Sequence, residues 1–122
     1  MKKYNVVFFG TPDFAVPSLE LLANHPQVNL KYIISMPDRK AGRGYEMKSP
    51  EVIEYAKSQR ISFFQTENIN KEVNFLDELE NEKIDFFIVL AFAQFLGNRL
   101  LELPQLGCFN IHTFLLLSLC II

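Results

Sequence analysis

The feature that most constrains the fold is a regular alternation of apolar runs with amphipathic stretches. The runs are rich in β-branched and aromatic residues, as strands buried on both faces are. They cover residues 5–9, 28–34, 61–64, 84–91 and 107–112. The stretches between them repeat apolar residues at helical spacing, over about 14–24, 50–60, 71–81 and 96–103. Strict alternation predicts a parallel sheet with right-handed crossovers, a doubly wound α/β fold of the Rossmann-like kind.

Length, charge and cysteine content narrow the class of protein. A chain of 122 residues, 49% of them hydrophobic, suits one domain with a buried core. Its net charge of −2 marks no DNA-binding surface, so any RNA contact needs a local basic cluster. No apolar run approaches the ~20 residues of a membrane span. With two cysteines and no signal peptide, we expect a cytoplasmic protein without a disulfide, a metal or a membrane partner.

Ligands of such sheets bind at the carboxyl ends of the strands, and the first loop there is GTPDF, residues 10–14. A dinucleotide site would need several glycines to bring backbone amides to a pyrophosphate. This loop has one glycine, then a proline without an amide donor, then Asp13, whose charge repels phosphate. The alternative is a tight turn in which Thr11 caps the next helix, Pro12 begins it and Asp13 favours its dipole.

The second loop, residues 37–48, gathers basic side chains in an otherwise mildly acidic chain. They are Arg39, Lys40, Arg43 and Lys48, with two glycines among them. Arginine can bind phosphate through two hydrogen bonds, so contact with a nucleic acid is one interpretation. A solvated surface loop is the other. A structureless loop of this length in a small domain is more often functional than idle.

The last predicted strand ends in an asparagine and a histidine. Alternation along the strand puts Asn110 and His112 on one side of the sheet and Ile111 on the other. An amide can donate to a developing oxyanion, and an imidazole can move a proton near neutral pH. The pair therefore suits acyl transfer. The alternative is a pair that satisfies backbone groups at the sheet edge.

Four stretches in this order resemble the N-terminal part of the methionyl-tRNA formyltransferases: FFGTPDFAVPSLELL, PDRKAGRGYEMKSPEVIEYA, AFAQFL and LPQLGCFNIHT. The resemblance implies an incomplete formyltransferase sheet over residues 1–113, in a monomer. It implies transfer of a formyl group from 10-formyltetrahydrofolate to the amino group of initiator methionyl-tRNA. The related enzyme that formylates glycinamide ribonucleotide would carry a glycine-rich first loop, which GTPDF is not. A sugar-nucleotide formyltransferase and a non-catalytic Rossmann-like binding module remain as alternatives.

The resemblance also implies roles for individual residues. Asn110 would polarise the formyl oxygen and stabilise the oxyanion, and His112 would carry the proton that leaves the amine or reaches folate N10. The donor pocket would be lined by Leu90, Ala91, Phe92, Ala93 and Gln94, together with Leu115 and Leu116. The acceptor end of the tRNA would be met by Arg39, Lys40, Arg43 and Lys48, with Arg43 the first candidate.

The resemblance breaks in the last nine residues, FLLLSLCII, residues 114–122. The family continues there with Ser-Leu-Leu-Pro and, further on, an aspartate that pairs with the catalytic histidine. We therefore expect residues 114–122 to be an aberrant hydrophobic tail, produced by a frameshift or truncation that the downstream DNA would reveal. Without the aspartate, we expect no measurable formyl transfer by this chain alone. Missing strands would also leave an open, aggregation-prone sheet edge.

Overall fold

Strands and helices alternate along the chain, as the sequence predicts. The computed structural model describes residues 2–44, 46–111 and 117–119. Its elements in chain order are β1 (Tyr4–Gly10), η1 (Asp13–Ala15), α1 (Val16–Asn24), β2 (Val28–Ser35), β3 (Arg39–Ala41), β4 (Glu46–Lys48), α2 (Glu51–Gln59), β5 (Phe63–Gln65), η2 (Ile69–Lys71), α3 (Val73–Asn81), β6 (Phe86–Leu90), α4 (Asn98–Glu102), β7 (Gly107–Ile111) and β8 (Leu117–Leu119).

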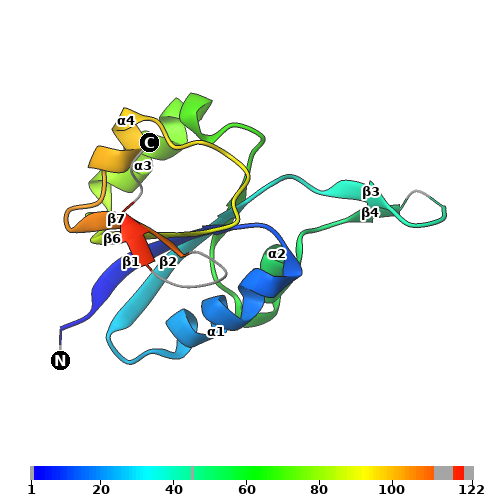
Figure 1. Cartoon of the computed structure of the whole chain (residues 1–122), viewed down its shortest axis with the longest axis horizontal. Coiled ribbons are helices and arrows are strands. Elements are labelled where there is room, and N and C mark those ends of the chain that lie inside the picture. The colour runs from blue at the N-terminus through cyan, green and yellow to red at the C-terminus, as the bar shows by residue number, and fades with distance from the viewer. Residues whose placement is uncertain (1, 45, 112–116, 120–122) are drawn as a thin grey trace.

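The main sheet has the strand order β5-β2-β1-β6-β7-β8. The pairs from β5 to β7 are parallel, and β8 alone is antiparallel to its neighbour. Helices α1 and α2 cover one face, and α3 and α4 cover the other (Figure 1). The doubly wound α/β prediction is confirmed.

The core consists of two clusters separated by the sheet. Central strand β1 supplies both, because Val7 and Phe9 point toward α3 and α4 while Phe8 points toward α1 and α2. All three side chains are 0% exposed. Phe9 also meets the rings of Phe87 and Phe92 edge-on, at centroid distances of 4.8 and 5.2 Å. Burial on both faces explains why this strand shows no polar alternation.

Residues 37–48, predicted to be a loop, contain a β-hairpin. Strands β3 and β4 form a separate two-stranded antiparallel sheet in which Arg39 pairs with Lys48 and Lys40 with Met47. The hairpin projects from the body of the molecule as an arm (Figure 1). We call residues 37–48 the arm. Strand signals are weak in this part of the sequence, since the arm's exposed strands need no apolar alternation.

The free edge expected beside β7 is occupied where the structure describes the tail. Leu117–Leu119 pairs antiparallel with β7, and Asn110 lies opposite Ser118. In the described residues β8 therefore replaces β7 as the last strand of the sheet on this side, and the expectation of an aggregation-prone edge stays a prediction. The rest of residues 114–122 lies outside the described residues.

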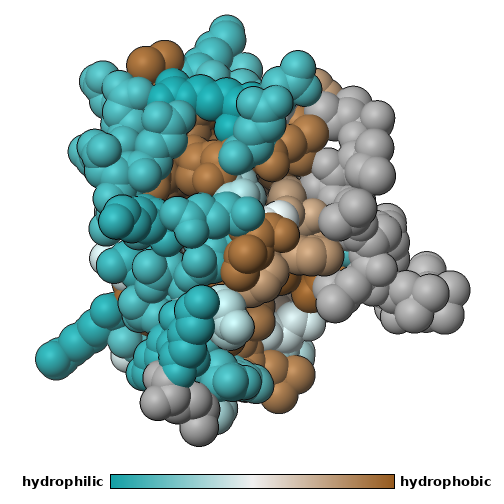
Figure 2. Space-filling model, turned by 90° about the vertical axis from the view of Figure 1, so that its left-hand side faces the viewer, coloured by the Kyte–Doolittle hydropathy of each residue, from teal (hydrophilic) through white to brown (hydrophobic). Residues whose placement is uncertain are grey.

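Figure 2 shows the end of the molecule away from the arm, where hydrophilic residues cover much of the surface and apolar residues form a band between them. Large exposed apolar side chains come from several separate elements, and among the residues whose burial is described Leu21 of α1 is the most open at 76%. In the described ranges, no helix combines the length and apolarity that crossing a bilayer requires.

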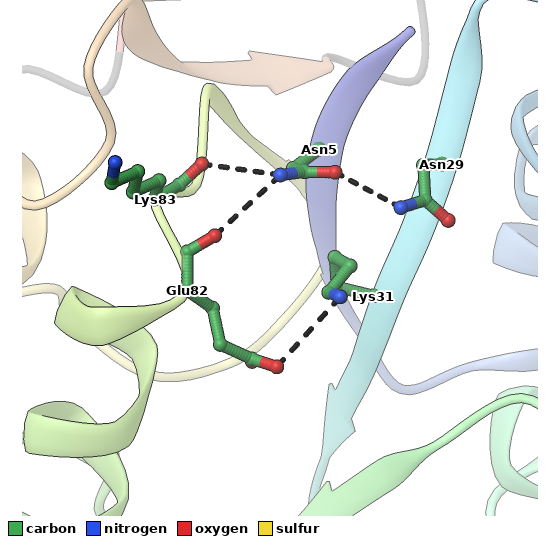
Figure 3. A network of polar contacts seen from close by, with 5 residues as sticks. All are labelled: Asn5, Asn29, Lys31, Glu82 and Lys83. Carbon is green, nitrogen blue, oxygen red and sulfur yellow. Dashed lines mark hydrogen bonds and ion pairs between the residues drawn. The ribbon is translucent and has the colours of Figure 1, made fainter.

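A polar network joins the amino ends of the strands (Figure 3). The Asn5 side chain accepts a hydrogen bond from Asn29 Nδ2 at 3.0 Å. Its own Nδ2 faces the carbonyl oxygens of Glu82 and Lys83, at 3.5 and 3.3 Å. One amide thus ties β1 to β2 and to the turn between α3 and β6.

Truncating Phe9 to alanine is expected to lower the free energy of unfolding by about 3–5 kcal/mol, because removal of its ring leaves a cavity beside the rings of Phe87 and Phe92. Urea unfolding at neutral pH measures the change. The control Leu21→Ala alters a largely exposed side chain on α1 and should stay within about 0.5 kcal/mol of the unaltered chain. Equal losses in the two variants would contradict this account of the core.

Candidate active site at the carboxyl edge of the sheet

The carboxyl ends of the parallel strands lie at one end of the sheet, which we call the carboxyl edge. The parallel register brings three predicted site segments there. Gly10, which ends β1, pairs with Leu90, which ends β6. On the other side of β6, Val89 pairs with Asn110 of β7. Asn110 therefore stands one strand away from the start of segment 90–94, which itself lies beside the first loop. Sequence alone predicted the edge, and the register supplies the adjacency.

Asn110 lies half-buried near the end of β7. Cys108 is buried in the cluster beneath α3 and α4, whereas Ile111 packs against the cluster beneath α1 and α2. Alternation therefore places Asn110 on the same face as Cys108. His112, Leu115 and Leu116 lie outside the described residues, so the predicted pairing of Asn110 with His112 stays a prediction.

The predicted donor-pocket segment has an unusual backbone. Ala91 and Ala93 have φ angles of 51° and 67°, in the left-handed region that residues with a Cβ rarely adopt. Leu90 and Phe92 turn into the two core clusters, while Ala91 and Ala93 are exposed. The segment thus presents backbone and two methyl groups at the edge. Its large side chains belong to the core.

Gln94 directs its side chain inward between loops. Its Oε1 accepts a hydrogen bond from the Ile69 amide at 2.8 Å, and its Nε2 donates to the Thr66 carbonyl at 2.8 Å. The same nitrogen lies 2.9 Å from the sulfur of Met36. These partners follow β5 and β2, so Gln94 connects three loops of the carboxyl edge.

The first loop differs from the predicted cap. Helix α1 begins at Val16 and is preceded by the η1 turn, with Pro12 in extended conformation before that turn. The predictions of Thr11 as cap and Pro12 as first helical residue are wrong. The Thr11 hydroxyl donates instead to the Phe92 carbonyl at 3.5 Å and accepts from Ser35 at 3.3 Å. The Thr11 hydroxyl thus forms hydrogen bonds with groups of neighbouring segments and does not cap the helix that follows it.

Gly10 is needed for packing between strands. A Cβ at this position would lie 2.9 Å from the Leu90 carbonyl oxygen and 2.7 Å from the Phe8 ring. The single glycine of the loop thus allows β1 and β6 to approach each other. This role is distinct from the phosphate contact that glycines provide in dinucleotide-binding loops.

Four polar side chains fasten the root of the arm. Asp38 Oδ1 accepts hydrogen bonds from Gln65 Nε2 at 2.7 Å and from Ser49 Oγ at 2.8 Å, and Lys57 Nζ donates to Ser49 Oγ at 3.2 Å. The bonds from Gln65 and Ser49, with the positive charge of Lys57 nearby, hold the pKa of Asp38 below its ordinary value. Sequence reasoning missed this cluster, because its members are spread over 38–65.

The basic side chains of the arm are exposed, as the prediction of an RNA contact requires. Arg39 and Lys48 are cross-strand partners, and like charges placed opposite each other destabilise a hairpin. Lys48 is partly compensated by Glu51, at 3.1 Å. Arg39 and Lys48 also border a hollow of about 460 Å³ whose other walls include Asp13, Met36 and Ala93. The root of the arm and Ala93 of segment 90–94 therefore share one surface depression.

The lowered pKa of Asp38 predicts a pH dependence of stability. The pKa of Asp38 is lower in the folded state than its ordinary value of 3.8, so its carboxylate stabilises the fold at pH values above 3.8. This contribution is lost as the pH falls through the pKa of the folded state. Asp38→Asn should therefore be less stable than the unaltered chain at neutral pH, with the difference vanishing in acid. Urea unfolding between about pH 3 and pH 7 measures it.

The matched control for this measurement is Gln65→Ala, which removes the largest cause of the lowered pKa. In the Gln65→Ala protein, the same Asp38→Asn change should lower the free energy of unfolding at neutral pH by less, and the loss should depend less on pH. If Asp38→Asn lowers the free energy of unfolding by the same amount at every pH, the assignment is contradicted.

Comparison with known proteins matches residues 2–118 to the family described as formyl transferase. Methionyl-tRNA formyltransferase of Halothermothrix orenii is 44% identical over 112 residues, which are 92% of this chain and 35% of that protein. The enzyme of the same name from Synechocystis is 44% identical over 110 residues, covering 90% of this chain and 33% of the relative. The chain thus spans about a third of the length of these relatives.

Solved structures show the same fold at low sequence identity. Glycinamide ribonucleotide transformylase 1 from Geobacillus kaustophilus superposes with a TM-score of 0.63 at 19% identity, over 92% of this chain and 58% of that structure. Phosphoribosylglycinamide formyltransferase from Anaplasma phagocytophilum gives a TM-score of 0.62 at 14% identity, over 92% and 50%. From the family match over nearly its whole length, the chain belongs to the formyl transferase family.

Proposed function

We propose that this chain forms the donor edge and the RNA-contacting arm of a methionyl-tRNA formyltransferase. The reaction moves a formyl group from 10-formyltetrahydrofolate to the amino group of initiator methionyl-tRNA, in the cytoplasm. The observation that carries the proposal is the shared edge: Asn110, segment 90–94 and the root of the basic arm meet there. The curated relatives with 44% identity carry this name.

Asn110 suits the charge that develops during formyl transfer. The amine nitrogen forms a bond to the formyl carbon, the oxygen gains negative charge, and the bond from that carbon to folate N10 then breaks. A side-chain amide aimed at the oxygen stabilises this charge, most strongly where water is partly excluded. The proton lost by the amine must reach N10, and His112 is the residue proposed to carry it.

The donor segment offers backbone groups to a flat heterocycle. Ala91 and Ala93 have small, exposed side chains, so a ring can approach the main chain closely. A pterin carries several hydrogen-bond donors and acceptors along one edge, which main-chain amides and carbonyls match. Strained backbone of this kind is concentrated at functional sites.

The arm supplies positive charge at a distance from the sheet. The chain as a whole has a net charge of −2, so the basic residues of the arm form a local site for phosphates. Arg39 and Lys48 stand at the root beside the hollow, while Lys40 and Arg43 lie further along the hairpin. This spacing suits an RNA end whose terminal residue enters the hollow and whose backbone follows the arm.

The first loop favours a tRNA substrate over a ribonucleotide phosphate. Pro12 offers no amide donor, and Asp13 places a carboxylate on the wall of the hollow. The glycinamide ribonucleotide enzymes share the fold with this chain, and a fold alone does not fix the acceptor.

Donor binding tests the folate half of the proposal. Calorimetry should detect binding of 5-formyltetrahydrofolate, a stable analogue of the donor. It should detect no binding of NAD or ATP. Asn110→Ala should weaken the affinity for the analogue about fivefold, which is the loss of one hydrogen bond of ~1 kcal/mol. The control Asn81→Ala removes an exposed amide at the end of α3 and should leave the affinity unchanged. Binding of NAD in place of the folate would overturn the proposal.

Arg43→Ala is expected to weaken binding of an RNA minihelix that carries the initiator acceptor stem. For each phosphate that the arm no longer neutralises, the slope of log affinity against log salt should become shallower by about 0.7–0.9. Fluorescence anisotropy at several salt concentrations measures both effects. The control Lys71→Ala removes an exposed positive charge of η2, outside the arm. Equal effects of the two substitutions would show that net charge, and not the arm, determines binding.

A further inference from the structure

Gln94 occupies a position where three loops meet. It follows Ala93, whose backbone is left-handed, and its half-buried side chain reaches residues that follow β2 and β5. The orientation of its amide is fixed by its partners: the Ile69 amide can only donate, and the Thr66 carbonyl can only accept. Both hydrogens of Nε2 are directed within the protein, one to Thr66 and one to the sulfur of Met36. Neither hydrogen of Nε2 is therefore available to donate to a pterin.

The strained segment is fastened on both sides of Gln94. On the side of the first loop, the Thr11 hydroxyl donates to the Phe92 carbonyl at 3.5 Å. On the other side, Asn70 donates to the Phe95 carbonyl and accepts from the Gly97 amide, both at 2.7 Å. Left-handed alanines are strained and persist only where surrounding contacts hold them. Thr11 holds the residue directly before Ala93, and Gln94, directly after it, contributes three side-chain contacts.

We infer that Gln94 is a positioning residue, which holds the left-handed donor segment and the root of the arm at Met36 in one fixed arrangement. The inference rests on the proposed function and changes the part that Gln94 plays in it. The side chain acts on the donor through Ala91 and Ala93. Because it also contacts Met36, two residues before Asp38, it links the donor segment to the residue from which the arm extends.

The opposite edge of the sheet offers a matched control. Asn5 has the same pattern of side-chain bonds as Gln94: it accepts one hydrogen bond and donates toward two acceptors (Figure 3). It also joins three elements. Asn5→Ala should therefore lower the melting temperature to a similar extent as Gln94→Ala while leaving the carboxyl edge intact. A general loss of stability would affect both variants alike.

The experiment compares Gln94→Ala, Gln94→Glu and Asn5→Ala in the full chain, at a temperature where all are folded. Amide hydrogen exchange should accelerate about tenfold or more over residues 66–70 and 91–97 in Gln94→Ala, and over the amino edge in Asn5→Ala. In Gln94→Glu the carboxylate still accepts from Ile69, so that amide should stay protected while 91–93 loosens. The affinity for 5-formyltetrahydrofolate should fall about tenfold in both Gln94 variants and stay unchanged in Asn5→Ala.

Each outcome decides a separate question. Unchanged exchange over residues 91–97 in Gln94→Ala overturns the positioning role, whatever the ligand does. Equal loss of folate affinity in Gln94→Ala and Asn5→Ala also overturns it, since the effect would then follow stability alone. If the unaltered chain binds no 5-formyltetrahydrofolate, the proposed function fails, and the exchange comparison still establishes whether Gln94 holds the segment.

Discussion

Burial of β1 on both faces is the constraint on which the rest of the structure depends. Val7, Phe8 and Phe9 are fully buried, and their alternation divides the core into two clusters. A strand covered on both sides needs helices above and below it, which the crossovers between parallel strands supply. All parallel strands then end at the same edge. The candidate site is a consequence of this geometry, because the loops that follow the parallel strands all leave the sheet at that edge.

Side-chain amides complete that geometry at the ends of the strands. Loops that leave a sheet expose backbone donors and acceptors, and those buried between loops must find partners. Gln94 serves this purpose at the carboxyl edge and Asn5 at the amino edge, while Gln65 holds the carboxylate at the root of the arm. An amide suits the role because it donates and accepts at once without carrying a charge. The two edges are therefore built by similar chemistry, and the carboxyl edge adds the hollow that Arg39, Lys48 and Ala93 border.

The arm separates charge from the folded body. Its four basic residues stand on a hairpin with exposed strands, so their charges are not buried in the core. The hairpin is anchored at its root by hydrogen bonds, where Asp38 accepts from Gln65 and Ser49 and Lys57 donates to Ser49. A root fastened by hydrogen bonds with a charged, protruding end is what the proposed contact with RNA requires.

The pattern of residues was enough to predict the fold and the edge of the sheet at which the candidate site lies. Apolar runs such as Asn5–Phe9 report burial directly, because each strand residue either faces a core or does not. The roles of Thr11 and Gln94 were not predictable in this way, since their partners lie between 24 and 81 residues away in the chain. The hairpin in the arm was missed because exposed strands carry no apolar signal.

By itself, then, the sequence determined which segments are buried, that they alternate as strand and helix, and which residues stand at strand ends. Tertiary structure alone decided that Gly10 lies against Leu90, that Ala91 and Ala93 adopt left-handed backbone, and which loops Gln94 joins. The physical reason is the range of the forces. Burial is a property of each residue and its near neighbours, whereas hydrogen bonds between loops depend on the register of strands brought together only in the folded chain.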